Sequence, residues 1–308
     1  MSPEYLIPIL ASTVGAATPL VYAALGELIV ERSGVLNLGV EGRMRVGAIA
    51  AFAVGTQSGS LALGLAGGVV AGMLLSLLFG FLTLTLQANQ VATGLALTLF
   101  GVGLSAFVGR DFVGKVVNGL KGLDIPLLGD LPVLGPLLFR FDILVYASIA
   151  LFVAMQWFLN STRGGLLIRA VGESPASAHA IGYPVIGIRY LAVLFGGAMS
   201  GLAGGYLSLA ITPMWVEGMT AGRGWIALAL VVFATWKPWR VVLGAYLFGG
   251  VTILQLHAQG FGVRVPSEFL SMLPYIATIV VLVIICRDPR TILLNQPVSL
   301  GQRYHPDG

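Results

Sequence analysis

Charged side chains are scarce in this chain. Asp, Glu, Lys and Arg make up 10% of its 308 residues, and 57% of the residues are hydrophobic, whereas soluble domains carry about 25% charged residues. A soluble fold of this length could not cover so much apolar surface in one or two cores. Several stretches instead reach the roughly 20 apolar residues needed to cross a bilayer. The composition predicts an all-α, polytopic membrane protein in which residues 1–308 form a single transmembrane domain.

Cysteine, lysine and histidine are also rare, which narrows the possible chemistry. The one cysteine, Cys286, excludes an internal disulfide and a cysteine-based metal site. The sequence has three lysines and no GxxxxGK[ST] motif, so it contains no P-loop for ATP. HExxH, CxxC and GxSxG are absent too, and His179, His257 and His305 stand alone. We therefore expect no catalytic residues, metal or cofactor, and a protein that moves a solute with energy supplied from outside this chain.

Nine apolar segments follow one another along the sequence. The second and seventh are too short to span a bilayer comfortably, so we expect half-helices or re-entrant elements there. Including such broken helices, we expect roughly eight to ten transmembrane helices. The segments cover approximately residues 6–25, 46–56, 61–86, 91–108, 141–159, 190–211, 225–236, 241–257 and 269–286.

The basic residues predict an orientation. If a loop over residues 160–189 is cytoplasmic, eleven of the 17 Lys and Arg side chains lie inside, as the positive-inside rule requires. A loop over 109–140 is then extracytoplasmic, and a short tail over 287–308 is cytoplasmic. No basic leader precedes the first apolar segment, so we expect no cleaved signal. The basic residues are scattered singly, which argues against binding of nucleic acid.

Small residues recur at every fourth position in two of the apolar segments. Such stripes let helix backbones approach closely in lipid. We expect them to pack inside one bundle, with a dimer interface as the alternative. The first stripe is Gly64, Gly68, Gly72, Ser76 and Gly80, and the second is Gly197, Gly201 and Gly205.

A short helix with clear end signals is predicted inside the loop over 160–189. Ser174 suits the N-cap, Pro175 the first helical position, and Gly182 the stop after the last turn. About two helical turns are too short to be stable alone. The helix therefore either packs against a partner or serves as a capped connector without one.

Four stretches resemble permease subunits of binding-protein-dependent ABC importers, in the sugar and nucleoside branch related to ribose and branched-chain amino acid permeases. They are GELIVERSGVLNLGVEG (26–42), NQVATGLALTLFGVGLS (89–105), RAVGESPASAHAIGYPVIGIRYLAVLFGGAMSGLAGGYLSL (169–209) and GRGWIALALVVFATWKPWRVVLGAYLFGG (222–250). The sequence departs from that pattern at Ala234, where glycine is usual, and at Thr98, where asparagine is common.

The resemblance implies a multi-pass permease in the bacterial inner (plasma) membrane that imports a nucleoside, a simple sugar or a similar hydrophilic solute. It also implies partners: two ATPase subunits, a second permease that is a sister chain or a second copy, and an extracytoplasmic substrate-binding protein. The short helix would be the coupling helix that contacts the ATPase. The candidate contact residues are Glu173, Ser174, Pro175, His179, Gly182 and Tyr183.

The charged stretch over 26–42 has two interpretations. In one, an interrupted helix dips into the membrane, with glycines permitting the break and Asn37 and Glu41 lining the path of the solute. In the other, the charges form a paired or solvated cytoplasmic turn, which explains the arginines better. We expect a mixture, with Asn37 and Glu41 lining or bracing the inner gate. The residues expected at the cytoplasmic boundary are Glu31, Arg32, Arg43 and Arg45.

Other polar residues extend the set of candidates for the translocation path. The full set is Glu27, Asn37, Glu41, Asn89, Gln90 and Thr93. The last three, with Gln87, could equally satisfy helix ends. On the outside, the residues that could meet a binding protein or anchor the bilayer are Trp215, Glu217, Arg223 and Trp225.

Two other classes of protein remain open from the residues alone. A secondary transporter would use Glu27, Glu41 or His257 as ion sites, and its uptake would follow an ion gradient and ignore ATP. A membrane-embedded enzyme would need a polar cluster at which turnover depends on a single residue, and the sequence offers none.

Overall fold

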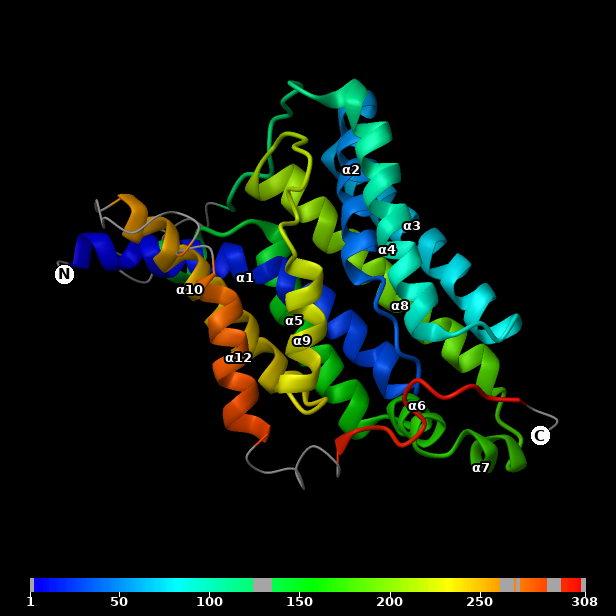
Figure 1. Ribbon diagram of the computed structural model, residues 1–308. Coiled ribbons are helices and arrows are strands. Elements are labelled where there is room, and N and C mark those ends of the chain that lie inside the picture. Colours follow the sequence, from blue (N-terminus) through cyan, green and yellow to red (C-terminus); the bar gives the residue numbers. More distant parts are fainter. Residues whose placement is uncertain (1–2, 124–134, 261–268, 270–271, 287–294, 306–308) are drawn as a thin grey trace.

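The computed structural model describes residues 3–123, 135–260, 269, 272–286 and 295–305 (Figure 1). Within these residues the chain is built from helices, without a β-sheet. The α-helices are α1 (Pro3–Arg32), α2 (Val40–Ser58), α3 (Leu61–Gly80), α4 (Gln90–Gly109), α5 (Ile143–Ser161), α6 (Arg163–Glu173), α7 (Pro175–Ala180), α8 (Val185–Tyr206), α9 (Arg223–Phe233), α10 (Pro238–Gly260) and α12 (Leu273–Cys286). The shorter turns are η1 (Phe81–Thr85), η2 (Arg110–Phe112), η3 (Gly135–Phe139) and η4 (Leu207–Ile211).

Six of the described helices are long and apolar enough to cross a membrane, fewer than the eight to ten expected. They are Leu6–Arg32, Leu61–Thr85, Gln90–Phe112, Ile143–Ser161, Val185–Ile211 and Pro238–His257. Helix α2 has 19 residues but carries three charged residues in its first two turns, at Glu41, Arg43 and Arg45. Helix α9 has 11 residues, and α12 has 14. Of the two segments predicted to be too short, the seventh corresponds to the 11-residue α9, whereas the second lies within α2, which is longer than predicted.

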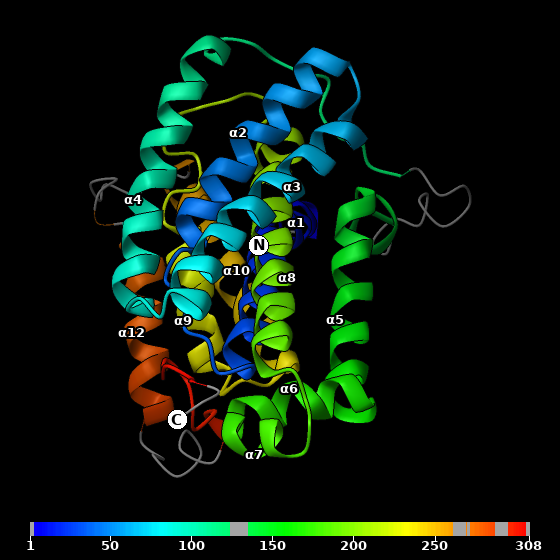
Figure 2. The same cartoon turned by 90° about the vertical axis from the view of Figure 1, so that its right-hand side faces the viewer.

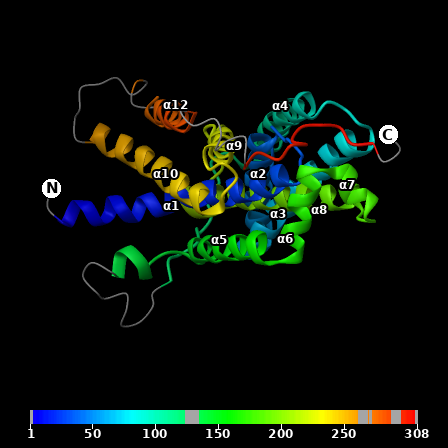
Figure 3. The ribbon, with the colours of Figure 1, turned by 90° about the horizontal axis from the view of Figure 1, so that it is seen from below.

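The two ends of the bundle carry different connections. In Figure 1 the short helices α6 and α7 lie at the lower end, and the turn after α4 lies at the upper end. Figure 2 shows α5 on the opposite side of the bundle from α4. Seen from below in Figure 3, α1 and α10 run side by side. The tail segment over 295–305 crosses the lower end, close to α6 and α7.

The two small-residue stripes pack against each other inside the bundle. A Cβ added at Gly72 would collide with the carbonyl oxygen of Gly197, and one at Gly201 would collide with that of Gly68. Helix α2 joins the same contact, because a Cβ at Gly47 would lie 2.5 Å from the Cα of Gly201. The prediction of packing within one bundle is therefore confirmed, and the stripes hold α2, α3 and α8 together.

We expect Gly201→Ala to destabilise the protein by about 1–3 kcal/mol, because an extra methyl group in a tightly packed contact forces the backbones apart. The matched control is Gly103→Ala, since a Cβ there meets nothing within 4 Å. Thermal unfolding of the purified protein in mild detergent measures the difference. Equal melting temperatures for the two variants would contradict the packing.

Candidate functional site

The helix break between α1 and α2 is held in place by α4. Residues 33–39 are not helical, and Gly34 has a φ of +87°, which glycine adopts without strain. The Gln90 side-chain oxygen accepts a hydrogen bond from the Leu36 amide at 2.8 Å, and the Thr98 hydroxyl donates to the Leu38 carbonyl at 3.0 Å. Polar side chains of α4 thus replace the hydrogen bonds that a continuous helix would supply.

Asn37 lies at the centre of this break and is fully buried. Its side-chain oxygen accepts a hydrogen bond from the Gly39 amide at 2.8 Å and so shapes the turn into α2. Its side-chain nitrogen has no hydrogen-bond partner within the described residues. Asn37 therefore keeps a free donor inside the bundle.

Glu41 connects the first turn of α2 to the beginning of α9. Its carboxylate accepts hydrogen bonds from the Gly224 amide at 2.8 Å, the Gly222 amide at 3.3 Å and the Thr220 hydroxyl at 2.5 Å. Arg45 donates to the same carboxylate at 3.1 Å. Figure 1 shows the lower end of α2 and the upper end of α9 at similar heights, near the middle of the bundle. A carboxylate at the start of a helix satisfies its free N–H groups and complements its dipole.

Glu27 and Arg43 form a buried ion pair. Their oxygen and nitrogen atoms are 2.6 Å apart, and both side chains are almost fully buried. Arg43 also donates to the Ser76 hydroxyl at 3.1 Å. This cluster ties α1, α2 and α3 together. Of the neighbouring charges, Glu41 contacts Arg45, whereas Arg43 contacts Glu27.

The end of α1 is tied to the turn after α9. The Trp236 indole donates to the Glu31 carboxylate at 2.6 Å, and Arg32 donates to the Trp236 carbonyl at 2.8 Å. Thr235 and Trp236 have φ values of +48° and +53°, and these contacts hold that turn. Glu31 is buried in protein rather than solvated.

Among the remaining candidates, Asn89 satisfies a helix end. Asn89 caps α4 by accepting a hydrogen bond from the Ala92 amide at 3.0 Å, and Thr93 is half-buried one turn later. His257 shares a hydrogen bond of 3.0 Å with the Ile253 carbonyl of its own helix. Trp215 is buried in an apolar cluster with Phe52 and Phe112, so it is neither a bilayer anchor nor part of a free surface.

Helix α7 has the predicted end signals. The Ser174 hydroxyl accepts a hydrogen bond from the Ser177 amide at 3.3 Å, Pro175 begins the helix, and Gly182 has a φ of +91° after it. Of its six residues, Ala178 is the buried one. Beyond its end, Ile181 is 72% exposed. The other exposed residues among the candidates for ATPase contact are Glu173, His179, Gly182 and Tyr183.

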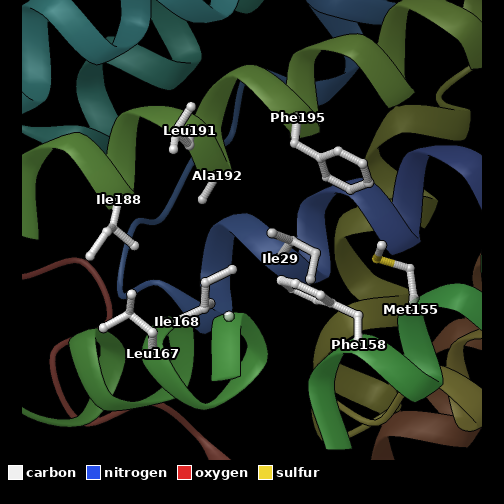
Figure 4. Close-up of a pocket in the computed structure, with 10 residues that line it drawn as sticks. Ile29, Met155, Phe158, Leu167, Ile168, Ile188, Leu191, Ala192 and Phe195 are labelled. Atoms are coloured by element: carbon white, nitrogen blue, oxygen red, sulfur yellow. The ribbon is translucent and has the colours of Figure 1, made fainter. Parts of the chain in front are cut away.

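A cavity of about 420 Å³ opens between α1, α5, α6 and α8 (Figure 4). Its lining is apolar: Ile29, Met155, Phe158, Gly164, Leu167, Ile168, Ile188, Leu191, Ala192 and Phe195. None of the polar candidates for the translocation path lines it. A hydrophilic solute would find no hydrogen-bonding side chain there, so the cavity does not suit a solute of that kind.

Comparison with known proteins identifies the family. Residues 9–283 match the family described as the permease component of the branched-chain amino acid transport system. The chain belongs to this family. It is 42% identical to the "Putative glucose ABC transporter permease protein TsgC13" of Haloferax volcanii, over 96% of this chain and 97% of that protein. It is 34% identical to the guanosine ABC transporter permease protein NupQ of Bacillus subtilis, over 91% and 92%. It is 33% identical to the nucleoside ABC transporter permease protein NupC of Lactococcus lactis, over 89% and 90%.

The resemblance seen in the sequence is therefore confirmed. The permease is the transmembrane subunit of an ABC importer and a multi-pass protein of the inner (plasma) membrane. Permease subunits of this kind are not enzymes themselves, and they work with ATPase and substrate-binding protein partners.

Proposed function

We propose that this permease carries a nucleoside, a simple sugar or a similar hydrophilic solute, together with a second permease subunit, and that ATP is hydrolysed in partner subunits that dock on α7. The observation that carries the proposal is the exposed, fully capped α7 at one end of a membrane bundle. The names of the relatives, glucose, guanosine and nucleoside permeases, support this class of solute.

The surface formed by α7 and the residues just after it is suited to contact with a protein partner. A helix of 6 residues gains little stability from its own hydrogen bonds. Ile181 and Tyr183 nevertheless expose 72% and 44% of their surfaces beside it. Burying such apolar surface against an ATPase would stabilise both the helix and the complex.

The helix break supports the assignment of the path and gate. Discontinuous helices near the middle of a membrane protein often form its solute site, because their ends present free backbone groups. Here α2 and α9 both begin close to Glu41, and the free side-chain nitrogen of Asn37 lies in the adjoining break. We assign Asn37 to contact with solute when the gate opens and Glu41 to bracing the beginnings of α2 and α9.

The test is recovery of the ATPase with the tagged permease from its native membrane in mild detergent, followed by mass spectrometry. We expect Ile181→Asp to reduce the recovered P-loop ATPase roughly tenfold, because a charge replaces an apolar contact at the interface. The control is Val116→Asp, since Val116 is 64% exposed in the connection after α4, at the other end of the bundle. A sister permease in the same fraction would define the pairing.

Two results would contradict the proposal. Unchanged recovery of the ATPase with Ile181→Asp would remove α7 from the interface. Recovery of the wild-type permease alone, with uptake that follows an ion gradient and ignores ATP, would favour an ion-coupled transporter instead.

A further inference from the structure

The tail segment over 295–305, which we call the C-terminal strap, is hydrogen-bonded into the α7 end of the bundle. The Ser299 amide donates to the Gly172 carbonyl at the end of α6, at 3.0 Å. The Gly301 amide donates to the Gly34 carbonyl in the helix break, at 3.1 Å. The strap thus contacts both the helix that leads into α7 and the break between α1 and α2.

A buried arginine reinforces the junction between the strap and the break. Arg189 of α8 is 1% exposed, and its guanidinium donates to the Ser33 carbonyl at 3.1 Å and to the Ser299 hydroxyl at 3.0 Å. The Ser299 hydroxyl in turn donates to the Gly172 carbonyl at 2.7 Å. A buried guanidinium is costly without hydrogen-bond partners. These contacts therefore fix the position of Ser299 relative to α6 and α8.

The far end of the strap packs against the inner face of α7. The side chain of Tyr304 is 9% exposed and belongs to a small apolar cluster with Ala178 and Val185. Its ring centroid lies 6.2 Å from that of His179. Ala178 is the buried residue of α7, so the inner face of that helix packs against the same cluster as the strap.

Two glutamines connect the strap to the start of α4. The Gln87 side chain donates to the Tyr304 carbonyl at 3.0 Å, and the Gln90 side chain donates to the Gln302 carbonyl at 3.4 Å. Gln90 also accepts the hydrogen bond from the Leu36 amide in the break. The Gln90 side chain therefore contacts both the strap and the helix break between α1 and α2.

We propose that the C-terminal strap is a coupling element that transmits movement of α7 to the helix break and the start of α4. The proposal rests on the docking of the ATPase at α7 proposed above. When α7 is displaced, Tyr304 moves with it, and the hydrogen bonds of Gly301 and Gln302 carry that movement to Gly34 and Gln90. Ser299 holds the strap to Gly172 and Arg189. Tyr304 and Ser299 are positioning residues, since neither would touch the solute.

The test follows an ATP-driven change at the start of α4 and does not require a known solute. The importer, assembled with its ATPase in lipid nanodiscs, carries Val91→Cys as a reporter in a Cys286→Ser background. Val91 follows Gln90 and is 40% exposed. The measurement is the rate of maleimide labelling with and without ATP and vanadate, together with ATP hydrolysis by the same sample.

We expect Tyr304→Ala to reduce the ATP-dependent change in labelling rate about fivefold or more, the scale of an ordinary coupling free energy. Co-purification of the ATPase and ATP hydrolysis should persist. Tyr304→Phe should behave as wild type, because it keeps the ring that packs against α7. The control within the strap is Val298→Ala, since Val298 is 67% exposed.

If Tyr304→Ala fails to fold, Ser299→Ala tests the strap proposal instead, because it removes only the hydroxyl between Arg189 and Gly172. A smaller ATP-dependent change in labelling rate in this variant would support the strap proposal. A wild-type response in either folded variant would overturn it. If the importer without strap substitutions binds no ATPase, the proposed docking at α7 fails and the strap proposal fails with it. If it binds the ATPase but labelling of Val91→Cys does not change with ATP, the strap proposal alone fails.

Discussion

Replacing Arg43 with methionine should destabilise the permease by about 3–5 kcal/mol, because it leaves the Glu27 carboxylate buried without its partner. The two groups lie 2.6 Å apart, and both are shielded from solvent. Arg43 also holds the Ser76 hydroxyl of α3. The loss should appear as a lower melting temperature in detergent and as less permease in the membrane.

The double variant Glu27→Met/Arg43→Met should recover most of that loss. Removing both charges together leaves no unpaired ion, and apolar side chains of similar volume often replace a buried pair at little net cost. Arg45→Met is the matched control, since the Arg45 side chain is 20% exposed and Glu41 keeps its contacts with Thr220, Gly222 and Gly224. A double variant no more stable than Arg43→Met would show that the pair is not an isolated unit.

The same pair bears on the rival assignment of Glu27 as an ion site. A carboxylate that binds a transported cation must present its charge to that cation. Glu27 instead faces a guanidinium at 2.6 Å, which neutralises it. The geometry therefore favours a structural role for Glu27, and the double variant distinguishes the two roles: an ion site would lose uptake even when stability is restored.

Local signals in the sequence predicted the local features well. The cap, the first-position proline and the stop glycine of α7 act within about two turns of helix, so adjacent residues determine them. The small-residue stripes follow from helical spacing alone, and they mark the contact of α3 with α8. The short length of α9 could likewise be seen in the apolar segments, whereas α2 extends to 19 residues because it includes the charged residues before its apolar part.

Contacts between distant parts of the chain could not be predicted from the sequence. Arg43 does not pair with Glu41, which is two residues away in sequence. It pairs instead with Glu27, on the other side of the helix break. Trp236 reaches Glu31 over more than half the chain. The strap was expected only as a short tail, because its partners Gly34, Gly172 and Arg189 lie far away in sequence. Such pairings depend on how helices pack, which spacing and composition do not specify.

Glu41→Ala should abolish uptake and also destabilise the permease. The substitution removes the acceptor for the Gly222 and Gly224 amides at the beginning of α9, and a hydrogen bond to a charged group contributes about 1.5–3 kcal/mol. It also leaves Arg45 without its carboxylate. Without this brace, α2 and α9 are no longer held together where both begin.

Measuring uptake and stability together separates a brace from a solute contact. A residue that only touches the solute can be removed without lowering the melting temperature, since its partner is absent from the resting protein. A residue that caps α9 lowers both. Glu41→Gln keeps one acceptor oxygen for the amides and should lie between wild type and Glu41→Ala in both measurements. If Glu41→Ala melts as wild type does while uptake is lost, Glu41 lies in the path of the solute. Other contacts then hold α2 and α9 together.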